Sequence, residues 1–347
     1  MKLGLGAVGF GPRVNINLDL IRRAEALGFD SAWTAEAYGN DAVTTATWVL
    51  AHTTRLKVGT AIMQMPARQP AMAAMTAMTL DHLSGGRFIL GLGPSGPQVV
   101  EGWYGVPYGK PLTRTREYIQ IIRQILARER PLEFHGEHYD IPVSGEGTTG
   151  LGRPLKSILH GNPEIPIYTA SISPNGLRCA AEVADGVFPM MMDPEKADSV
   201  YLPHLEQGFA KAGGGKSLEN FAVVPAVTVI IADDLERARM PVKGHMSLYI
   251  GGMGARNKNF YNDLAKRLGY EEAAMQIQDL FLDGKKKEAA AAVPDELVDA
   301  CHLVGPAARI RERLQVWKEA GAKRWVDTML LGTSQPEALE LVAEELL

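Results

Sequence analysis

The sequence is poor in cysteine, in long apolar runs and in clustered positive charge, and each shortage argues against a class of protein. Its two cysteines, Cys179 and Cys301, form no C-x-x-C pair, which argues against a zinc ribbon or a disulfide framework and suits a reducing cytoplasm. No apolar run reaches the roughly 18 residues of a membrane-spanning helix, and the residues after Met1 lack the apolar core of a signal peptide. The formal net charge is −4 without a basic stripe, so we expect a cytoplasmic protein that does not bind nucleic acid.

Common phosphate-binding and nucleophile motifs are missing or incomplete. Neither a P-loop nor a G-x-S-x-G motif occurs. The segment Gly4–Gly9 matches G-x-G-x-x-G, but the three residues before it are too few for the strand that a dinucleotide-binding motif requires. The segment Gly91–Gly96 also matches and follows a plausible strand. Pro94 and Pro97 come next, however, and the next clear helix begins only near Thr113, so a phosphate on a helix N-terminus is poorly supported there.

A metal site is not expected either. His135 and His138 have H-x-x-H spacing but lie in residues 132–141, which resemble a β-hairpin, and there the two side chains would point to opposite faces. No other group of histidine, aspartate and glutamate has the spacing of metal ligands.

Short apolar segments alternate with amphipathic ones along the 347 residues, which is typical of a parallel sheet with helices outside it. Most of the strands are nearly continuously apolar, as in residues 221–231, and strands buried on both faces have this composition. Eight strands are predicted, at about residues 2–8, 31–34, 56–62, 87–92, 165–170, 187–191, 222–231 and 325–331. We therefore predict an α/β fold, a (β/α)8 TIM barrel formed by a single domain over residues 1–347.

The intervening helices have one apolar stripe each. Tyr118, Ile121, Ile122 and Ile125 fall on one helical face, and a helix over residues 15–27 would end at Gly28. Two segments are longer than ordinary connections, at about residues 93–164 after the fourth strand and 232–324 after the seventh. In a barrel these insertions lie at the carboxyl ends of the strands, so we expect them to build or cover a substrate pocket.

Two polar features lie where a barrel carries its active site. Ser173 can cap a helix that begins at Pro174, and the free N–H groups at that helix start could bind a phosphate, although an ordinary capped helix explains the same pattern. Glu36 follows the second strand and would sit at the rim, as a site residue or as a solvated or capping carboxylate. Because a rim residue contributes little to packing, we expect Glu36→Gln to weaken cofactor binding or turnover with little change in stability.

Longer stretches resemble the luciferase-like monooxygenase superfamily over nearly the whole chain. The most specific is Thr79-Leu-Asp-His-Leu-Ser-Gly-Gly-Arg87 with Gly91-Leu-Gly93, and residues 55–62, 95–108 and 184–187 also match. The sequence is most similar to the coenzyme F420-dependent oxidoreductase branch, which includes the methylenetetrahydromethanopterin reductases. The resemblance implies a barrel that binds a deazaflavin or flavin at its C-terminal mouth, and a homodimer.

The resemblance also implies where the cofactor would lie. A non-proline cis peptide bond at Ala61–Ile62 would back the ring, Glu36 and Ser95 would lie beside it, and the phosphate would rest on the backbone at the start of the helix after the fifth strand. The cofactor-binding residues predicted in this way are Glu36, Thr60, Ala61, Ile62, Gly93, Ser95, Ser171, Ile172 and Ser173. Glu36 is also a candidate catalytic residue.

The sequence departs from the family's sugar-phosphate dehydrogenases. Their histidine after the conserved carboxylate is matched here by Ala37, and their glutamate after the fourth strand is matched by Gly96. The resemblance therefore favours a reductase that moves hydride from reduced F420 to a C=N or activated C=C bond of a small substrate, and its proton donor stays open among Glu36, Tyr38, Tyr104, Tyr108 and water. Two alternatives remain, namely an FMN-dependent monooxygenase and a non-catalytic barrel that has lost its cofactor.

Overall fold

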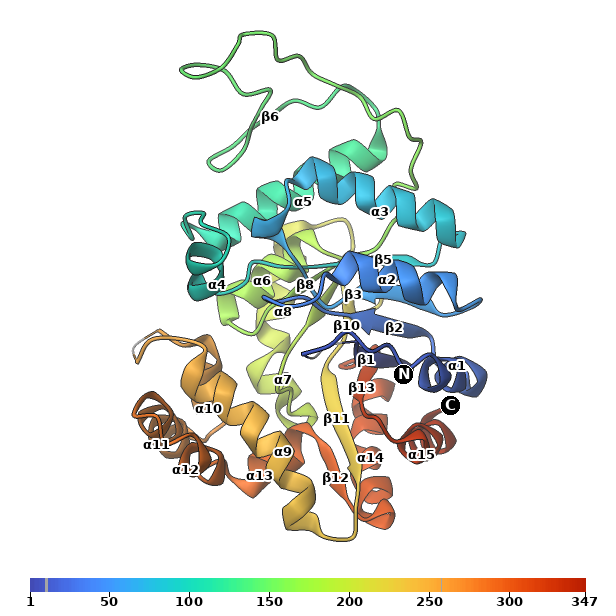
Figure 1. Ribbon diagram of the computed structural model, residues 1–347, viewed down its shortest axis with the longest axis vertical. Helices are drawn as coiled ribbons and strands as arrows, with labels where there is room; N and C mark the ends of the chain where they lie inside the picture. The colour runs from blue at the N-terminus through green and yellow to red at the C-terminus, as the bar shows by residue number, and fades with distance from the viewer. Residues whose placement is uncertain (10–11, 257) are drawn as a thin grey trace.

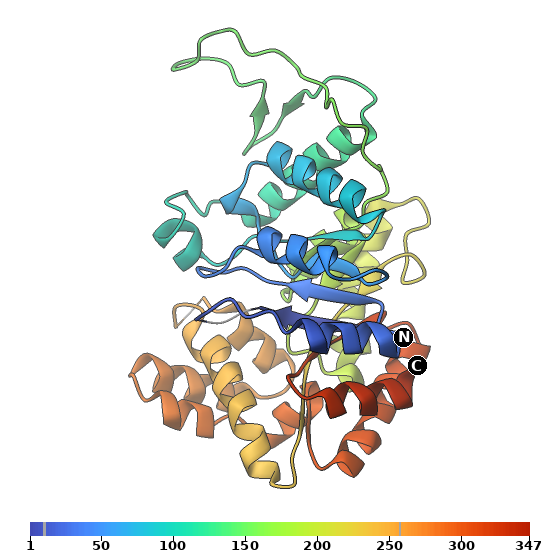
Figure 2. The same ribbon diagram turned by 45° about the vertical axis from the view of Figure 1, so that its right-hand side comes forward.

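The protein is built around one parallel sheet that curls on itself and carries most of its helices outside (Figures 1 and 2). The computed structural model describes residues 1–9, 12–256 and 258–347. The strands of this sheet are β1 (Lys2–Val8), β2 (Ser31–Thr34), β3 (Lys57–Thr60), β4 (Met63–Gln64), β5 (Phe88–Gly93), β8 (Ile167–Ala170), β9 (Gly186–Phe188), β10 (Ala222–Val223), β11 (Ala226–Ile231), β12 (Leu303–Gly305) and β13 (Thr328–Gly332).

Strand pairing continues around the sheet through residues 222–231. The strands pair in the order β9, β8, β5, β3, β2, β1, β13 and β11, while β10 pairs with β9. Only Val224 and Pro225 separate β10 from β11, and the Pro225 carbonyl accepts a hydrogen bond from the Leu330 N–H at 2.9 Å. The segment thus contacts β9 at its start and β13 further along. The predicted α/β architecture is confirmed as a curled parallel sheet.

The predicted strands are found with small shifts at their ends, and two short strands of the sheet, β4 and β12, were missed. Strand β12 pairs with Val229–Ile231, the part of β11 that extends past its partner β13. With three residues in a region rich in helical patterns, β12 is too short to show a period of its own. Its pairing shows that β11 continues beyond the end of β13 and leads into the helical region.

The helices follow the expected pattern of local signals. Helix α1 begins at Leu18 rather than near residue 15, because the Asn17 side chain caps its first turn, and it ends as expected at Gly28 in a left-handed conformation. The other α-helices are α2 (Ala42–Ala51), α3 (Pro70–Ser84), α4 (Pro97–Gly102), α5 (Pro111–Ala127), α6 (Pro174–Val183), α7 (Ala197–Val200), α8 (Leu202–Ala212), α9 (Leu235–Ser247), α10 (Phe260–Arg267), α11 (Glu271–Leu282), α12 (Lys286–Ala291), α13 (Asp295–Cys301), α14 (Ala307–Ala322) and α15 (Pro336–Leu346). Short 3-10 helices lie at η1 (Met65–Ala67) and η2 (Pro194–Lys196), and η3 (Leu248–Gly252) is a π-helix.

Two long connections carry structure of their own. The connection after β5 holds α4, α5 and the antiparallel hairpin of β6 (Phe134–His135) and β7 (Asp140–Ile141), which extends away from the sheet in Figure 1 and confirms the predicted hairpin. The connection after β11 holds α9 to α14, η3 and β12. The exact bounds of the two insertions and the single-domain organisation remain predictions. No helix in the part of the chain that the structure describes is long and apolar enough to cross a membrane.

Candidate functional site

The predicted site residues follow consecutive strands of the sheet. Strands β2, β3, β5 and β8 are neighbours in that order, and they are parallel. Glu36, Ala61–Ile62, Ser95 and Ser171–Ser173 come after these four strands, so they gather at the carboxyl end of the sheet, where barrels place their active sites.

Strand β3 ends in an irregular segment that packs closely on β5. The Thr60 hydroxyl donates to the Gly91 carbonyl at 2.7 Å and accepts from the Gly91 N–H at 3.0 Å. The Ala61–Ile62 peptide bond is cis, as the resemblance implied. A Cβ atom at Gly91 would lie 1.6 Å from the Thr60 carbonyl oxygen, and one at Gly93 would lie 2.7 Å from Cδ1 of Ile62. The glycines of this motif therefore serve close packing of two strands, not a phosphate loop.

Glu36 is a buried residue that accepts hydrogen bonds from several segments, rather than a loosely packed rim residue. Its side chain is 5% exposed and forms a bidentate pair with Arg68, at 2.6 and 3.1 Å. Its two oxygens also accept the N–H groups of Gln64 at 2.7 Å and of Ala42, the first residue of α2, at 3.0 Å. The premise of a loosely packed rim residue is therefore wrong. Because a glutamine keeps only one acceptor oxygen for these four donors, we expect Glu36→Gln to lower stability.

The side chain of Arg68 joins Glu36 to Asp41, the N-cap of α2. Burial alone would lower the pKa of Arg68, but its bonds to Glu36 and the charge of Asp41 outweigh this and raise the pKa. Arg68 could not be predicted from the sequence, since an isolated arginine after a short 3-10 helix has no distinguishing pattern.

The start of α6 presents backbone donors, as predicted. The Ser173 hydroxyl accepts the Gly176 N–H at 3.1 Å, which confirms the helix cap, and Pro174 is the first helical residue. The Ser171 N–H makes a long bond of 3.4 Å to the Phe188 carbonyl. Within the described ranges, no protein acceptor is found for the N–H groups of Ile172 and Ser173. These two groups are available to an anion.

Two arginines that the sequence did not single out lie beside this helix start. Arg267, from α10, donates to the Ile172 carbonyl at 2.7 Å, and Nη2 of Arg178 lies 3.4 Å from Nδ1 of His204. The Nε atoms of both arginines are buried without a partner, and neither arginine forms an ion pair with a described carboxylate. Burial, followed by the charges of these two arginines, lowers the pKa of His204. The region is therefore cationic and suited to an anionic group.

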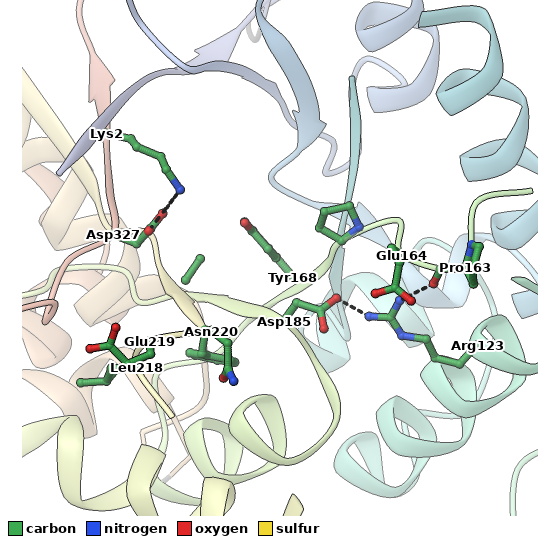
Figure 3. Close-up of a pocket in the computed structure, with 13 residues that line it drawn as sticks. Lys2, Arg123, Pro163, Glu164, Tyr168, Asp185, Leu218, Glu219, Asn220 and Asp327 are labelled. Carbon is green, nitrogen blue, oxygen red and sulfur yellow. Dashed lines mark hydrogen bonds and ion pairs between the residues drawn. The ribbon is translucent and has the colours of Figure 1, made fainter. Parts of the chain in front are cut away.

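A cavity lies at the other end of the sheet (Figure 3). It has a volume of about 510 Å³ and is lined by residues at the amino ends of strands, among them Lys2, Tyr168 and Ala222. Lys2 pairs with Asp327 at 3.3 Å and Arg123 pairs with Asp185, so these charges neutralise one another. Features at this end of a barrel usually serve stability, and we do not assign the reaction to this cavity.

The two histidines with H-x-x-H spacing take part in no metal cluster. His135 on β6 bonds to Asp140 on β7 at 2.6 Å. No group of three histidine, cysteine, aspartate or glutamate side chains in residues 1–9, 12–256 and 258–347 is arranged to hold a metal ion.

Residues 4–324 match the model of the luciferase-like monooxygenase family. The chain belongs to this family. It is 46% identical over 331 residues to a Mycobacterium tuberculosis protein that carries the provisional name coenzyme F420-dependent oxidoreductase Rv3520c, covering 94% of this chain and 95% of the relative. It is 28% identical to the 5,10-methylenetetrahydromethanopterin reductase of Archaeoglobus fulgidus, with 94% and 93% of the two chains covered. The solved coenzyme F420-dependent tetrahydromethanopterin reductase of Methanopyrus kandleri superposes with a TM-score of 0.78 at 25% identity, over 99% of this chain and 98% of that one.

Proposed function

We propose that this protein is a coenzyme F420-dependent oxidoreductase, and that it acts as a reductase on a C=N or activated C=C bond of a small organic substrate. One observation carries the proposal most directly. The backbone donors of Ile172 and Ser173 lack protein acceptors beside Arg178 and Arg267, two cations without carboxylate partners. Such an arrangement needs an anion to complete it, and a cofactor phosphate is one. The names of the relatives point to F420 as the cofactor.

The residues at the carboxyl ends of the strands fit this cofactor. The start of α6 and Arg267 would hold the phosphate, while Thr60, Ala61, Ile62 and Gly93 would form the surface behind the ring. When bound, F420 supplies a deazaflavin ring that accepts or donates hydride. The task of the protein is to orient the substrate over that ring and to exclude water.

The mouth contains phenols that keep their protons. Burial, followed by the nearby Glu36 charge, raises the pKa of Tyr104, whose hydroxyl donates to the Ala37 carbonyl at 3.4 Å. Burial likewise raises the pKa of Tyr108. A protonated phenol can donate a proton as hydride arrives at the substrate, and Ala37 leaves no histidine for this step. The absence of that histidine argues against the dehydrogenation of sugar phosphates.

The test is a comparison of F420 and FMN binding by tryptophan fluorescence, in the wild type and in Arg267→Ala. We expect micromolar F420 binding that the substitution weakens at least tenfold, because a charged hydrogen bond to the phosphate is lost. Arg22→Ala is the matched control, since this arginine lies on α1 with its side chain 54% exposed. Preferential FMN binding would indicate a monooxygenase, and binding of neither cofactor by folded protein would indicate a barrel without a cofactor.

A further inference from the structure

Two groups of aromatic side chains lie on the side of the sheet where the chain leaves its strands. Tyr38 follows β2 and Trp103 follows α4, and their ring centroids are 6.4 Å apart with the side chains 62% and 64% exposed. In the second group, the Tyr249 ring lies 4.8 Å from His245 and 4.7 Å from Tyr261. Both views of the molecule place α4 and α10 on the same side of the sheet (Figures 1 and 2).

The backbone that carries Tyr249 is held in place by buried polar side chains. Tyr249 lies on the π-helix η3, and isolated π-turns are frequent at functional sites. The Asn259 side chain donates to the carbonyls of Tyr249 and Ile250 at 3.0 and 2.9 Å, and Asn262 donates to the Ile250 carbonyl at 3.2 Å. Both asparagines are 3% exposed. Two buried amides therefore satisfy carbonyls that the irregular helix leaves free, and they fix the position of the Tyr249 ring.

The two aromatic groups are close enough to influence one another electrostatically. Burial, followed by the nearby Tyr38 phenol, raises the pKa of Tyr249. Burial lowers the pKa of His245. No charged side chain contributes to either of these pKa values, whereas at the start of α6 the pKa of His204 is lowered by two arginines. Among the described residues, no hydrogen bond or ion pair joins the rings of Tyr38, Trp103, His245 or Tyr249 to a charged side chain.

We propose that Tyr249 is a specificity-determining residue which, together with His245, Tyr38 and Trp103, binds a neutral, planar, conjugated substrate. Aromatic rings bind such molecules by stacking or edge-to-face contact, while an anionic substrate would find no counter-charge among these four side chains. The inference rests on the proposed function, because it takes the start of α6 as the cofactor side of the mouth and the aromatic groups as the substrate side.

The test uses para-naphthoquinone as a neutral probe and its ring-sulfonated derivative as an anionic one. In the reaction, hydride from reduced F420 and one proton from water convert the quinone to the hydroquinone, and F420 is oxidised. The rate is followed by the return of oxidised F420 absorbance above the rate without protein. We expect the neutral quinone to have a KM at least tenfold below that of the sulfonate. Equal KM values, or a wild type that neither binds nor reduces the neutral quinone, would overturn the proposal.

The residue assignment is tested with Tyr249→Ala, Tyr249→Phe and a control, Trp48→Ala, which removes an exposed tryptophan of α2 whose ring lies 4.3 Å from that of His52. We expect Tyr249→Ala to raise the KM for the neutral quinone about tenfold, the loss of one aromatic contact, with kcat and the Kd for F420 within twofold of the wild type. Tyr249→Phe should keep the wild-type KM, and so should the control. An unchanged KM in Tyr249→Ala would overturn the proposal.

Failure of the proposed function gives a different result. If the wild type does not bind F420, the quinone can still be titrated against cofactor-free protein through quenching of tryptophan fluorescence. A Kd that rises about tenfold in Tyr249→Ala would then support the aromatic site without F420, and an unchanged Kd would refute it.

Discussion

Glu36→Gln is the substitution for which sequence and structure predict opposite results. The Glu36 carboxylate is 5% exposed and accepts four hydrogen bonds, two of them from Arg68. A glutamine offers one acceptor oxygen and turns an NH2 group toward donors. Removing one partner of a buried ion pair costs roughly 3–5 kcal/mol. Because Arg68 is 17% exposed and keeps Asp41 as a second partner, we expect a loss of about 2–3 kcal/mol.

Such a loss is measurable as a lower melting temperature. Each kcal/mol lowers Tm by roughly 2–4 °C in chains of about 150–250 residues, and by less in longer chains. With about 2 °C per kcal/mol for this chain, Glu36→Gln should lower Tm by about 4–6 °C. Circular dichroism against temperature and an F420 titration on the same samples give both readouts. Glu340→Gln is the control, because its pair with Arg23 has a similar length of 2.6 Å but exposed fractions of 41% and 50%. This control should change stability by less than about 1 kcal/mol.

A double-mutant cycle shows whether the loss comes from the ion pair. Arg68→Met alone leaves the Glu36 charge buried, while the double variant removes both charges, so we expect a coupling energy of about 2 kcal/mol. The reasoning is refuted if Glu36→Gln keeps the wild-type Tm while its F420 affinity falls more than tenfold. Glu36 would then be a cofactor ligand at a tolerant rim, as the sequence suggested.

Three further predictions address stability and the hairpin. Burial lowers the pKa of His302 to about 3, so between pH 3 and about 6.5 the unfolded chain binds one more proton than the folded one, and stability should fall by up to about 1.4 kcal/mol per pH unit as pH drops through this window. Urea unfolding of His302→Gln should show a smaller loss over the same window, and an identical pH dependence would contradict this. Gly91→Ala would place a Cβ 1.6 Å from a backbone oxygen, so it should prevent soluble folding or cost more than about 4 kcal/mol of stability. The control Gly102→Ala, where the added Cβ would have no atom within 4 Å, should express normally, and equal melting temperatures of the two variants would refute the packing role of Gly91. Glu117→Ala removes the acceptor of three successive N–H groups at residues 137–139, so hydrogen exchange of these amides should accelerate at least tenfold while the amides of α5 keep their protection. Unchanged exchange at these amides would show that other contacts hold the hairpin.

The sequence predicted those parts of the fold that depend on local physics. Strands buried on both faces need apolar residues almost throughout, so most segments of the sheet are visible in the composition alone. Caps are equally local, and both Gly28 and Ser173 act as predicted because the groups they satisfy lie within a turn. Strand β12 was missed because its pairing depends on how far β11 extends, and this is a property of the assembled sheet.

The candidate site was predictable only in part, for the same reason. The resemblance located the irregular end of β3 and the start of α6, since both are carried by contiguous motifs. Arg267 reaches the Ile172 carbonyl across 95 residues, and no spacing rule connects two residues so far apart. Glu36 was placed correctly after β2 but assigned the wrong environment, because its four donors come from residues 42, 64 and 68.

The proposed cofactor residues and the proposed substrate residue Tyr249 come from different parts of the fold, which suggests how cofactor and substrate recognition are separated. The proposed cofactor residues follow β2, β3, β5 and β8. Close packing between strands holds them in place: at Gly91, for example, a Cβ atom would lie only 1.6 Å from the Thr60 carbonyl oxygen. Tyr249 lies instead in the helical connection after β11, where its position depends on bonds within that connection. Substitutions near Tyr249 can therefore change the substrate pocket without altering strand packing, whereas substitutions near β3 disturb both the fold and the cofactor surface. We therefore expect variants with a different substrate range to arise in the connection after β11 while F420 affinity stays unchanged.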